Sequence, residues 1–264
     1  MIFRDQLQRV ITINKPLLRI VSLVPSQTEL LVDLGLEENL VGITKFCVHP
    51  GHLLKTKIIV GGTKEIKIER IRELQPDIIL CNKEENTLEM VQELEKISRV
   101  HVSDVIKIQD ALKLIEMYGV LFNKIETAAS LVNKIANQIE EFRKLPPHKL
   151  RVAYFIWRKP WMVAGSNTFI NSLLELNGWE NVYKDREERY PVIELEELNI
   201  ARLNLVLLSS EPFPFQEKHK KEIEVLYRGD IAYVDGEYFS WYGPRLLYAI
   251  EYFKQFQKQL SSSL

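Results

Sequence analysis

Residues 19–30, RIVSLVPSQTEL, decide the fold class, because an apolar run ends at a proline and a helical pattern follows at once. The apolar half predicts a short buried strand. Ser26 and Glu29 have the spacing of a capping box, and Gly35 stands where a helix C-cap glycine is expected. We therefore predict a strand that leads directly into a helix.

The same alternation of short apolar runs and helical patterns recurs along the chain. Strands are predicted at residues 19–24, 40–44, 77–81, 99–102, 151–157, 204–209 and 231–235. Helices are predicted at residues 27–34, 66–74, 86–97, 108–122, 124–145, 167–176 and 244–260. Short apolar strands that alternate with helices are typical of parallel sheets covered by helices on both faces. The predicted class is α/β.

One long helix is expected to join two Rossmann-like lobes. Apolar residues follow the i, i+3, i+4, i+7 rule over residues 124–145, which predicts a helix about 33 Å long that ends at Pro146 and Pro147. Both halves repeat one spacing: a glutamate (Glu69 or Glu197) stands nine positions before a strand residue. We predict an N-terminal lobe over residues 1–122, a connecting helix over 123–147 and a C-terminal lobe over 148–264.

Charge and hydropathy exclude two classes of partner. The 264 residues include 35 basic and 36 acidic side chains, so no net field attracts nucleic acid. No apolar segment approaches the roughly 20 residues that span a bilayer, so no membrane insertion is predicted. Residues 1–15 lack the apolar core of a signal peptide. We expect a cytoplasmic monomer from the sequence as it stands, or an extracytoplasmic one if a leader has been removed.

Catalytic and metal-binding patterns are weak. The sequence has no GxGxxG, P-loop, GxSxG or HExxH motif, so we predict that the protein is not an enzyme. Cys47 and His49 are weak metal-ligand candidates, since they lie near a Pro-Gly turn and no second cluster completes four ligands. No intrinsic cofactor or metal is expected. Cys47 and Cys81 are expected to be free buried thiols.

Aromatic residues gather in the second half of the chain beside turns that follow predicted strands. They are Trp157, Trp161, Tyr190, Tyr238, Phe239, Trp241 and Tyr242. Ligands of α/β proteins bind where strands end, and aromatic faces there suit a large flat ligand. The alternative is that each of these side chains simply fills the core.

These residues resemble, in order, the helical-backbone (class III) periplasmic-binding-protein-like substrate-binding proteins of cobalamin and iron-siderophore ABC importers. The matching segments are residues 19–30, 41–44, 46–50, 60–62, 68–71, 76–79, 165, 181–182, 197 and 243–245. The resemblance implies two lobes bridged by a rigid helix, with a metal chelate held in a cleft between them. The expected ligand is a corrinoid such as cobalamin, then an iron-siderophore or haem.

The resemblance also suggests roles for individual residues. Ligand contacts are expected from Phe46, Trp157, Arg158, Trp161, Tyr190, Glu237, Tyr238, Trp241 and Arg245, with the arginines pairing to ligand carboxylates. In the family, one glutamate on each lobe docks onto arginines of an ABC permease, and the matching positions are Glu69 and Glu197. The alternative for both is a solvated carboxylate in a first helical turn.

Two departures from the family pattern, the polar rim of the first lobe and the missing signal peptide, leave other functions open. The rim of the first lobe is polar, with Lys64 after the glycine pair and residues 82–86 after Cys81. The ligand would therefore either not be cobalamin or carry more polar groups on one face. An intracellular enzyme or carrier that handles metals or tetrapyrroles on the same scaffold is the alternative, and it would need Glu237 or His49 in the cleft. A structural adaptor without a small ligand is a third reading.

Overall fold

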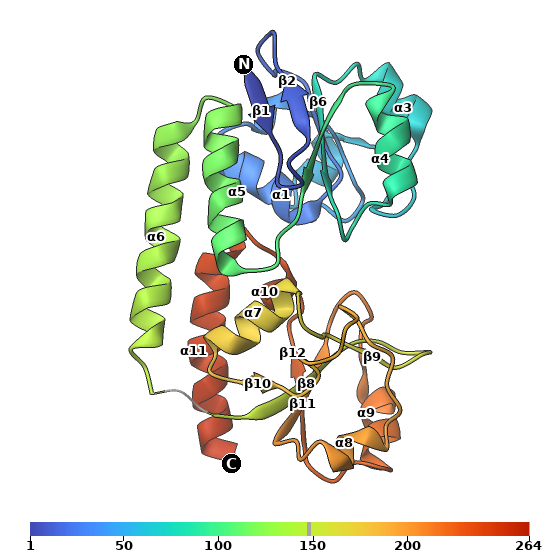
Figure 1. Ribbon diagram of the computed structural model, residues 1–264, viewed down its shortest axis with the longest axis vertical. Coiled ribbons are helices and arrows are strands. Elements are labelled where there is room, and N and C mark those ends of the chain that lie inside the picture. The colour runs from blue at the N-terminus through green and yellow to red at the C-terminus, as the bar shows by residue number, and fades with distance from the viewer. Residues whose placement is uncertain (147–148, 264) are drawn as a thin grey trace. The chain divides into compact units, whose positions relative to one another are not determined.

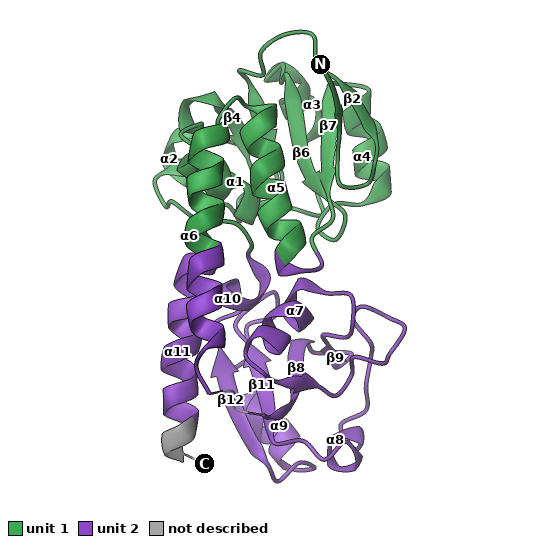
Figure 2. Cartoon of the chain, turned by 60° about the vertical axis from the view of Figure 1, so that its left-hand side comes forward, with its two compact units in different colours: residues 1–105, 109–135, 242–245 green, residues 106–108, 136–241, 246–264 purple. Residues whose placement is uncertain are grey.

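The computed structural model describes residues 1–146 and 149–263 (Figure 1). The chain forms two compact units (Figure 2), which we call lobe 1 and lobe 2. Lobe 1 contains Met1–Val105, Gln109–Ile135 and Tyr242–Arg245, and lobe 2 contains Ile106–Ile108, Ala136–Trp241 and Leu246–Leu264. The predicted domain boundaries stay a prediction. The predicted helix stop at Pro147 and the boundary between residues 147 and 148 lie outside the described residues.

Lobe 1 is built on a parallel sheet with the strand order β5-β4-β3-β6-β7. The strands are β3 Ile20–Ser22, β4 Leu40–Ile43, β5 Ile58–Ile59, β6 Ile78–Asn82 and β7 Arg99–Ser103. β3 and β6 are buried throughout, so both faces of the sheet must be covered. The predicted α/β class with parallel strands is confirmed.

Helices cover both faces of this sheet. They are α1 Pro25–Asp33, the 3₁₀ helix η1 Glu37–Asn39, α2 Leu53–Thr56, α3 Ile68–Glu73, α4 Leu88–Glu95, α5 Ile108–Leu121 and the first part of α6 Ile125–Arg143. Figure 1 shows α3 and α4 on one side of the sheet and α1 and α5 on the other. Ile79 and Cys81 pack with Ile71 and Leu94 on the α3 and α4 side, which follows from the period-2 alternation of a strand.

The start of α1 differs from the prediction. Its N-cap is Val24, which makes no side-chain cap, and Pro25 occupies the first turn, where a missing N–H costs nothing. Ser26 and Glu29 therefore lie inside the helix, and the predicted capping box is wrong. The predicted helix end is confirmed, because Gly35 follows the helix and its backbone has a φ of +71°, as a C-cap glycine does.

An N-terminal hairpin that the sequence pattern did not predict covers the outer edge of the lobe 1 sheet. Strands β1 Ile2–Arg4 and β2 Val10–Thr12 pair antiparallel. Arg99 Nε of edge strand β7 donates to the Thr12 carbonyl at 2.6 Å, and Arg9 donates to the Val100 carbonyl at 2.6 Å. The hairpin thus uses polar groups of β7 that an exposed edge strand would offer to other chains.

Lobe 2 has a second mainly parallel sheet with the strand order β10-β8-β11-β12, and β9 pairs antiparallel with β8. The strands are β8 Arg151–Trp157, β9 Met162–Val163, β10 Glu180–Asn181, β11 Leu205–Ser209 and β12 Asp230–Val234. β9 runs backwards because a tight turn follows Trp157 and returns the chain along β8. That turn contains Lys159, whose φ is +63°.

The helices of lobe 2 are α7 Phe169–Leu176, α8 Glu197–Ile200, α9 Glu217–Glu224, α10 Glu237–Ser240 and most of α11 Arg245–Ser263, together with the last part of α6. Leu198 of α8 and Ile223 of α9 pack with Phe155 on one face of the sheet. On the other face Phe239 of α10 contacts Tyr154 of β8 at 5.1 Å between ring centroids. The short helices α8, α9 and α10 were not predicted.

Two adjacent residues near the start of α11 belong to different lobes. Trp241 is a lobe 2 residue, and its indole N–H donates to Glu211 Oε1 at 2.9 Å within that lobe. Tyr242 is a lobe 1 residue, and its hydroxyl accepts from Gln27 Nε2 at 2.9 Å. Lobe 1 is therefore completed by a segment that comes from the far end of the chain.

Candidate ligand-binding site

The carboxyl ends of the strands in each lobe are the first place to look for a ligand site in a parallel sheet. In lobe 1, Phe46 follows β4 and its side chain is 48% exposed. The backbone holds the loop, since the Lys45 amide donates to the Gly61 carbonyl at 2.8 Å. A Cβ on Gly62 would lie 3.1 Å from the Phe46 ring, so the glycine leaves room for the ring to lie close to the backbone.

Lysines follow three strands at this edge. Lys45 Nζ lies 5.0 Å from the centroid of the Phe46 ring, a cation–π geometry. Lys64 donates to the backbone carbonyl of Glu84, and Lys83 pairs with Asp104 at 2.8 Å. The rim of lobe 1 is therefore charged and polar around its one exposed aromatic ring, as the sequence suggested.

A buried polar network that the sequence did not reveal lies beneath this rim. Gln27 donates to Ser103 Oγ at 2.6 Å and to the Tyr242 hydroxyl, and it accepts from the Tyr118 hydroxyl at 2.7 Å. Asn82 joins the network through Ser103, and its Oδ1 accepts from the backbone N–H groups of residues 84 and 85. Burial raises the pKa of Tyr242 to about 12, so its hydroxyl stays neutral. The network fixes the rim loop after β6.

In lobe 2, aromatic rings gather at the carboxyl ends of β8 and β11. Trp157 ends β8 with its side chain 40% exposed, and its ring meets Phe213 edge to face at 5.6 Å. Phe213 in turn contacts Phe215 at 4.9 Å, and Trp161 stacks on Phe215 at 6.2 Å. Trp161 is half-buried against the core, so it supports the cluster while Trp157 presents its ring to solvent. The sequence pattern missed both phenylalanines.

Three residues that were predicted to contact a ligand interact with other residues of their own lobe. Arg158 makes two bonds to the Glu222 carboxylate of α9, at 2.8 and 2.9 Å. Arg245 makes two bonds to Glu29 of α1, at 3.1 and 2.7 Å, and is 8% exposed. Trp241 is 7% exposed. Their roles toward a ligand stay predictions, because each group is engaged within its own lobe.

The loops after β11 and β12 bring carboxylates together in lobe 2. Glu211 accepts from Ser240 Oγ at 2.7 Å and from Trp241 Nε1 at 2.9 Å through the same oxygen. Burial raises the pKa of Glu211, and the nearby charges of Glu237 and Asp235 act in the same direction. The predicted contact Glu237 is thus half-buried at the start of α10 beside two other acids.

The two predicted tyrosines are both half-buried. Tyr238 stacks on Tyr252 of α11 with ring centroids 4.8 Å apart and an interplanar angle of 27°. Tyr190 lies in the loop that follows β10, where the Gly165 amide donates to the Arg189 carbonyl at 2.8 Å. The stacking holds Tyr238 against α11, and the contact of either tyrosine with a ligand stays a prediction.

Cys47 is a structural thiol in this arrangement. Its sulfur lies 3.1 Å from the Thr28 hydroxyl and 3.2 Å from the Thr44 hydroxyl, and burial raises its pKa. Cys81 is also free and buried, with a pKa raised to about 12. Within residues 1–146 and 149–263, no group of three His, Cys, Asp or Glu side chains, with or without His49, could hold a metal ion.

The two predicted docking glutamates differ in their surroundings. Glu69 lies in the first turn of α3 with its side chain 79% exposed, and it pairs only loosely with Arg72 at 3.3 Å. Glu197 begins α8, pairs with Arg186 at 2.5 Å and accepts the Glu194 backbone N–H at 3.1 Å. The lobe 2 carboxylate is therefore held more firmly than the lobe 1 carboxylate.

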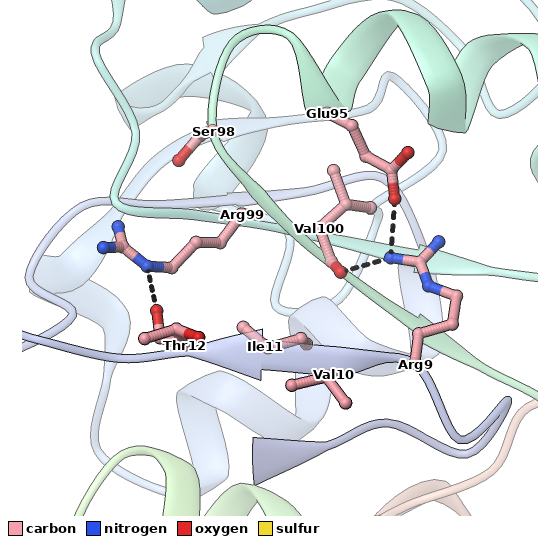
Figure 3. Close-up of a pocket in the computed structure, with 8 residues that line it drawn as sticks. All are labelled: Arg9, Val10, Ile11, Thr12, Glu95, Ser98, Arg99 and Val100. Carbon is pink, nitrogen blue, oxygen red and sulfur yellow. Dashed lines mark hydrogen bonds and ion pairs between the residues drawn. The ribbon is translucent and has the colours of Figure 1, made fainter. Parts of the chain in front are cut away.

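A shallow pocket of about 400 Å³ lies where the N-terminal hairpin meets β7 (Figure 3). Arg9 bridges Val100 and Glu95 across it, and Arg99 reaches back to Thr12. These contacts join the two walls to each other. The pocket lies along the contact between the N-terminal hairpin and the edge strand β7, away from the carboxyl ends of the strands.

Residues 20–230 match a protein-family model described as periplasmic binding protein. The chain belongs to this family. Among relatives of this periplasmic binding protein, a vitamin B12-binding protein of Vibrio campbellii is 25% identical over 200 residues, 75% of this chain and 72% of that protein. An uncharacterized ABC transporter substrate-binding lipoprotein of Bacillus subtilis is 24% identical over 262 residues, 94% of this chain and 82% of the relative.

Solved structures of periplasmic binding proteins share the fold. A periplasmic vitamin B12-binding protein of Vibrio cholerae has a TM-score of 0.76 and 19% identity, covering 92% of this chain and 97% of that one. A periplasmic heme-binding protein of the same species has a TM-score of 0.77 and 21% identity, covering 91% and 98%. The resemblance to ABC importer substrate-binding proteins is thus confirmed. No helix in the described part of the chain is long and apolar enough to cross a membrane.

Proposed function

We propose that this periplasmic binding protein captures a metal chelate for an ABC importer, through the carboxyl edges of its sheets. One observation carries the proposal. Among the phenylalanines and tryptophans of the described residues, Phe46 and Trp157 alone are exposed, and each follows or ends a strand at a carboxyl edge. An aromatic ring left in water at such an edge is a stacking surface for a ligand.

The names of the relatives support the class of ligand. Relatives and structural neighbours include proteins named for binding vitamin B12 or heme, and a further structural neighbour, with a TM-score of 0.77, is named as an Fe³⁺-hydroxamate transport system of Saccharomonospora viridis. A corrinoid such as cobalamin is our first candidate, followed by haem and an iron-siderophore. The polar rim of lobe 1 suits the amide, carboxylate or hydroxyl groups that surround such chelates.

Binding without catalysis is part of the proposal. Burial lowers the pKa of His101 to about 3 and raises the pKa of Tyr154 well above its usual range. Both shifts keep a buried side chain uncharged, which suits a structural role rather than acid–base chemistry. The chain would work as a monomer without a resident cofactor.

The test is a titration of the purified protein with cyanocobalamin, dicyanocobinamide, haemin and a ferric hydroxamate, followed by tryptophan fluorescence and visible absorbance. Loss of one stacked ring should weaken binding about two- to tenfold, so Trp157→Ala and Phe46→Ala should each raise the Kd. Tyr248→Ala removes a ring of similar exposure (59%) from α11 and is the matched control. The proposal fails if none of the four ligands binds saturably.

A permease is the proposed partner, and work outside the cytoplasm is the proposed location, as for relatives named periplasmic or lipoprotein. Glu69 and Glu197 would dock onto cationic residues of that permease. In a reconstituted importer, Glu69→Arg should lower transport while ligand affinity stays unchanged, and Glu73→Arg on the same helix is the control. Equal transport by the Glu69→Arg variant and the wild type would refute this docking role.

A further inference from the structure

A second pocket of lobe 1, with a volume of about 430 Å³, lies at the amino edge of the sheet. Its lining residues are Lys15, Arg72, Gln75, Pro76, Asp77, Lys96 and Ile97. They come from the segments that precede β3, β6 and β7, three strands that are neighbours in the sheet. The pocket therefore lies at the opposite edge from the carboxyl ends of the strands, where the ligand of the proposed function would bind.

Hydrogen bonds between the three segments hold the walls of this pocket. Asp77 Oδ2 accepts the backbone N–H groups of the two residues before β3, at 3.0 and 2.9 Å. The Arg19 guanidinium donates twice to the Leu74 carbonyl, at 3.0 and 2.7 Å, and Ser98 Oγ donates to the Pro76 carbonyl at 2.7 Å. The loops that surround the pocket are thus fixed to one another before any ligand binds.

Asp77 supplies the one carboxylate of this lining among the described residues, and internal bonds use both of its oxygens. Oδ1 pairs with Lys15 at 2.5 Å, while Oδ2 takes the two backbone bonds. Burial acts to raise the pKa of Asp77, but the bonds from Lys15 and from the backbone outweigh it, so the pKa is lowered and the carboxylate is ionised. Lys15 balances this charge, and the other two cations of the lining, Arg72 and Lys96, have no counter-charge within it.

Arg72 and Lys96 pair instead with carboxylates outside the lining. Arg72, whose side chain is 54% exposed, lies 3.3 Å from Glu69, and Lys96, 65% exposed, lies 2.5 Å from Glu93; each partner is three residues earlier in the chain. Exposed pairs of this kind contribute only about 0–1 kcal/mol, so an anion that meets both cations at once can compete with them. Gln75 adds an exposed carboxamide with N–H donors to the same lining.

We propose that this pocket binds a phosphate-type oxyanion, with the Arg72 guanidinium and the Lys96 ammonium as its charged contacts and the Gln75 carboxamide as a further donor. A tetrahedral oxyanion offers oxygens in several directions and carries up to two charges, so it can meet donors from α3 and from the end of α4 together. The planar guanidinium can bind two of those oxygens. A single carboxylate would satisfy one cation and leave the other with its glutamate. The oxyanion can be free phosphate or the headgroup of a lipid.

The test is a titration of the full-length protein with inorganic phosphate, and separately with acetate, at a constant ionic strength set with sodium chloride. The readout is the ¹⁵N NMR spectrum, in which the Ile97 backbone amide and the Gln75 side-chain amide report on the pocket. Arg72→Met and Lys96→Met each remove one proposed contact. Arg70→Met on the same helix α3 and Lys113→Met on α5 are matched controls, because each removes an exposed cation of lobe 1 that does not line the pocket.

We expect phosphate to shift both signals saturably in the low millimolar range, and Arg72→Met and Lys96→Met each to raise its Kd about three- to tenfold. Both controls should bind phosphate as the wild type does, and acetate should bind more weakly. Shifts that do not saturate, that saturate equally in the wild type and in Arg72→Met and Lys96→Met, or that acetate reproduces at the same concentration would overturn the inference. The proposed function would stand in each case, because it concerns the opposite edge of the sheet.

Vesicle sedimentation separates the two sources of the oxyanion. The protein is mixed with phosphatidylcholine vesicles that contain phosphatidic acid, and with vesicles of phosphatidylcholine alone. Binding to the first kind only, lost in Arg72→Met and Lys96→Met, identifies a lipid headgroup as the ligand. Saturable phosphate binding without sedimentation on either kind identifies a free phosphate.

Discussion

Removing Arg245 should leave lobe 1 with a buried carboxylate, Glu29, that has lost its main counter-charge. Arg245 and Glu29 are 8% exposed each, and two bonds of 3.1 and 2.7 Å join them. Burial raises the pKa of Glu29, and the guanidinium partly offsets that effect. Breaking a buried ion pair from one side costs about 3–5 kcal/mol, so we expect Arg245→Met to lower the free energy of unfolding by about 3 kcal/mol at pH 7.5.

The cost should depend on pH in a defined direction. Without the guanidinium, the folded-state pKa of Glu29 rises further above its unfolded value, so the folded state binds the proton more tightly. The stability of the variant is then greatest at low pH and falls as pH rises through the folded pKa, by up to about 1.4 kcal/mol per pH unit. Asp33, whose pKa burial also raises and Arg245 lowers, should add to this slope. We expect a cost of only about 1 kcal/mol at pH 5.

Urea denaturation followed by circular dichroism at several pH values measures this cost. Arg72→Met removes an exposed arginine from the same lobe and should change the free energy of unfolding by less than about 0.5 kcal/mol. The double variant Glu29→Met/Arg245→Met should recover to within about 1 kcal/mol of the wild type, since apolar pairs replace buried ion pairs well. A cost below about 1 kcal/mol at pH 7.5, or one that stays constant from pH 5 to 8.5, would refute the reasoning.

Three further predictions concern buried groups. His101 lies between the rings of Phe3 and Tyr118, and both of its ring nitrogens lack a hydrogen bond. Because burial lowers its folded-state pKa to about 3, the free energy of unfolding of the wild type should fall as the pH drops below 6.5. In urea titrations, His101→Leu should reduce this loss of stability between pH 7 and pH 5 by about 1–2 kcal/mol. Gly42→Ala would place a Cβ 2.7 Å from Leu74 Cδ1 and should lower the free energy of unfolding by about 1–3 kcal/mol. Gly51→Ala would place its Cβ 3.7 Å from the nearest atom and should leave the stability unchanged. Equal stability of the two variants would contradict this packing. Cys47 and Cys81 should not react with a thiol reagent at pH 8 until denaturant unfolds the chain, and fast labelling of the native protein would show that these thiols are accessible.

Local pattern predicted the regular elements well because each depends on neighbouring residues. The strand at 151–157 was predicted with the bounds that β8 has, and the helix predicted at 124–145 is α6, Ile125–Arg143. The hairpin β1–β2 was missed because its three-residue strands lie among charged residues, and it is held by Arg9, Arg99 and Asp5 bonding to distant backbone. Such contacts leave no periodic signal.

The candidate site was harder to predict, since the partner of a charged side chain is a long-range property. Arg245 was predicted to bind a ligand carboxylate, but it forms an ion pair with Glu29, which lies 216 positions away in the sequence. Arg158 meets Glu222 from α9, a helix that the sequence pattern did not reveal. Trp157 was predicted as a ligand contact because it stands at a predicted strand end, and Phe46 because of the family resemblance. Only the structure separates these exposed rings from buried Trp241.

The arrival of Tyr242 and Arg245 in lobe 1 has a consequence for the newly made protein. The rest of lobe 1 ends at Ile135, so the ribosome adds a further 110 residues, from 135 to 245, before these two side chains exist. At about 5–20 residues per second, that is a delay of roughly 5–20 seconds during which Glu29 has no arginine and Gln27 has no tyrosine. The first lobe to be synthesised is therefore among the last parts to be finished, and a chain released early would expose an incomplete N-terminal lobe to chaperones and proteases.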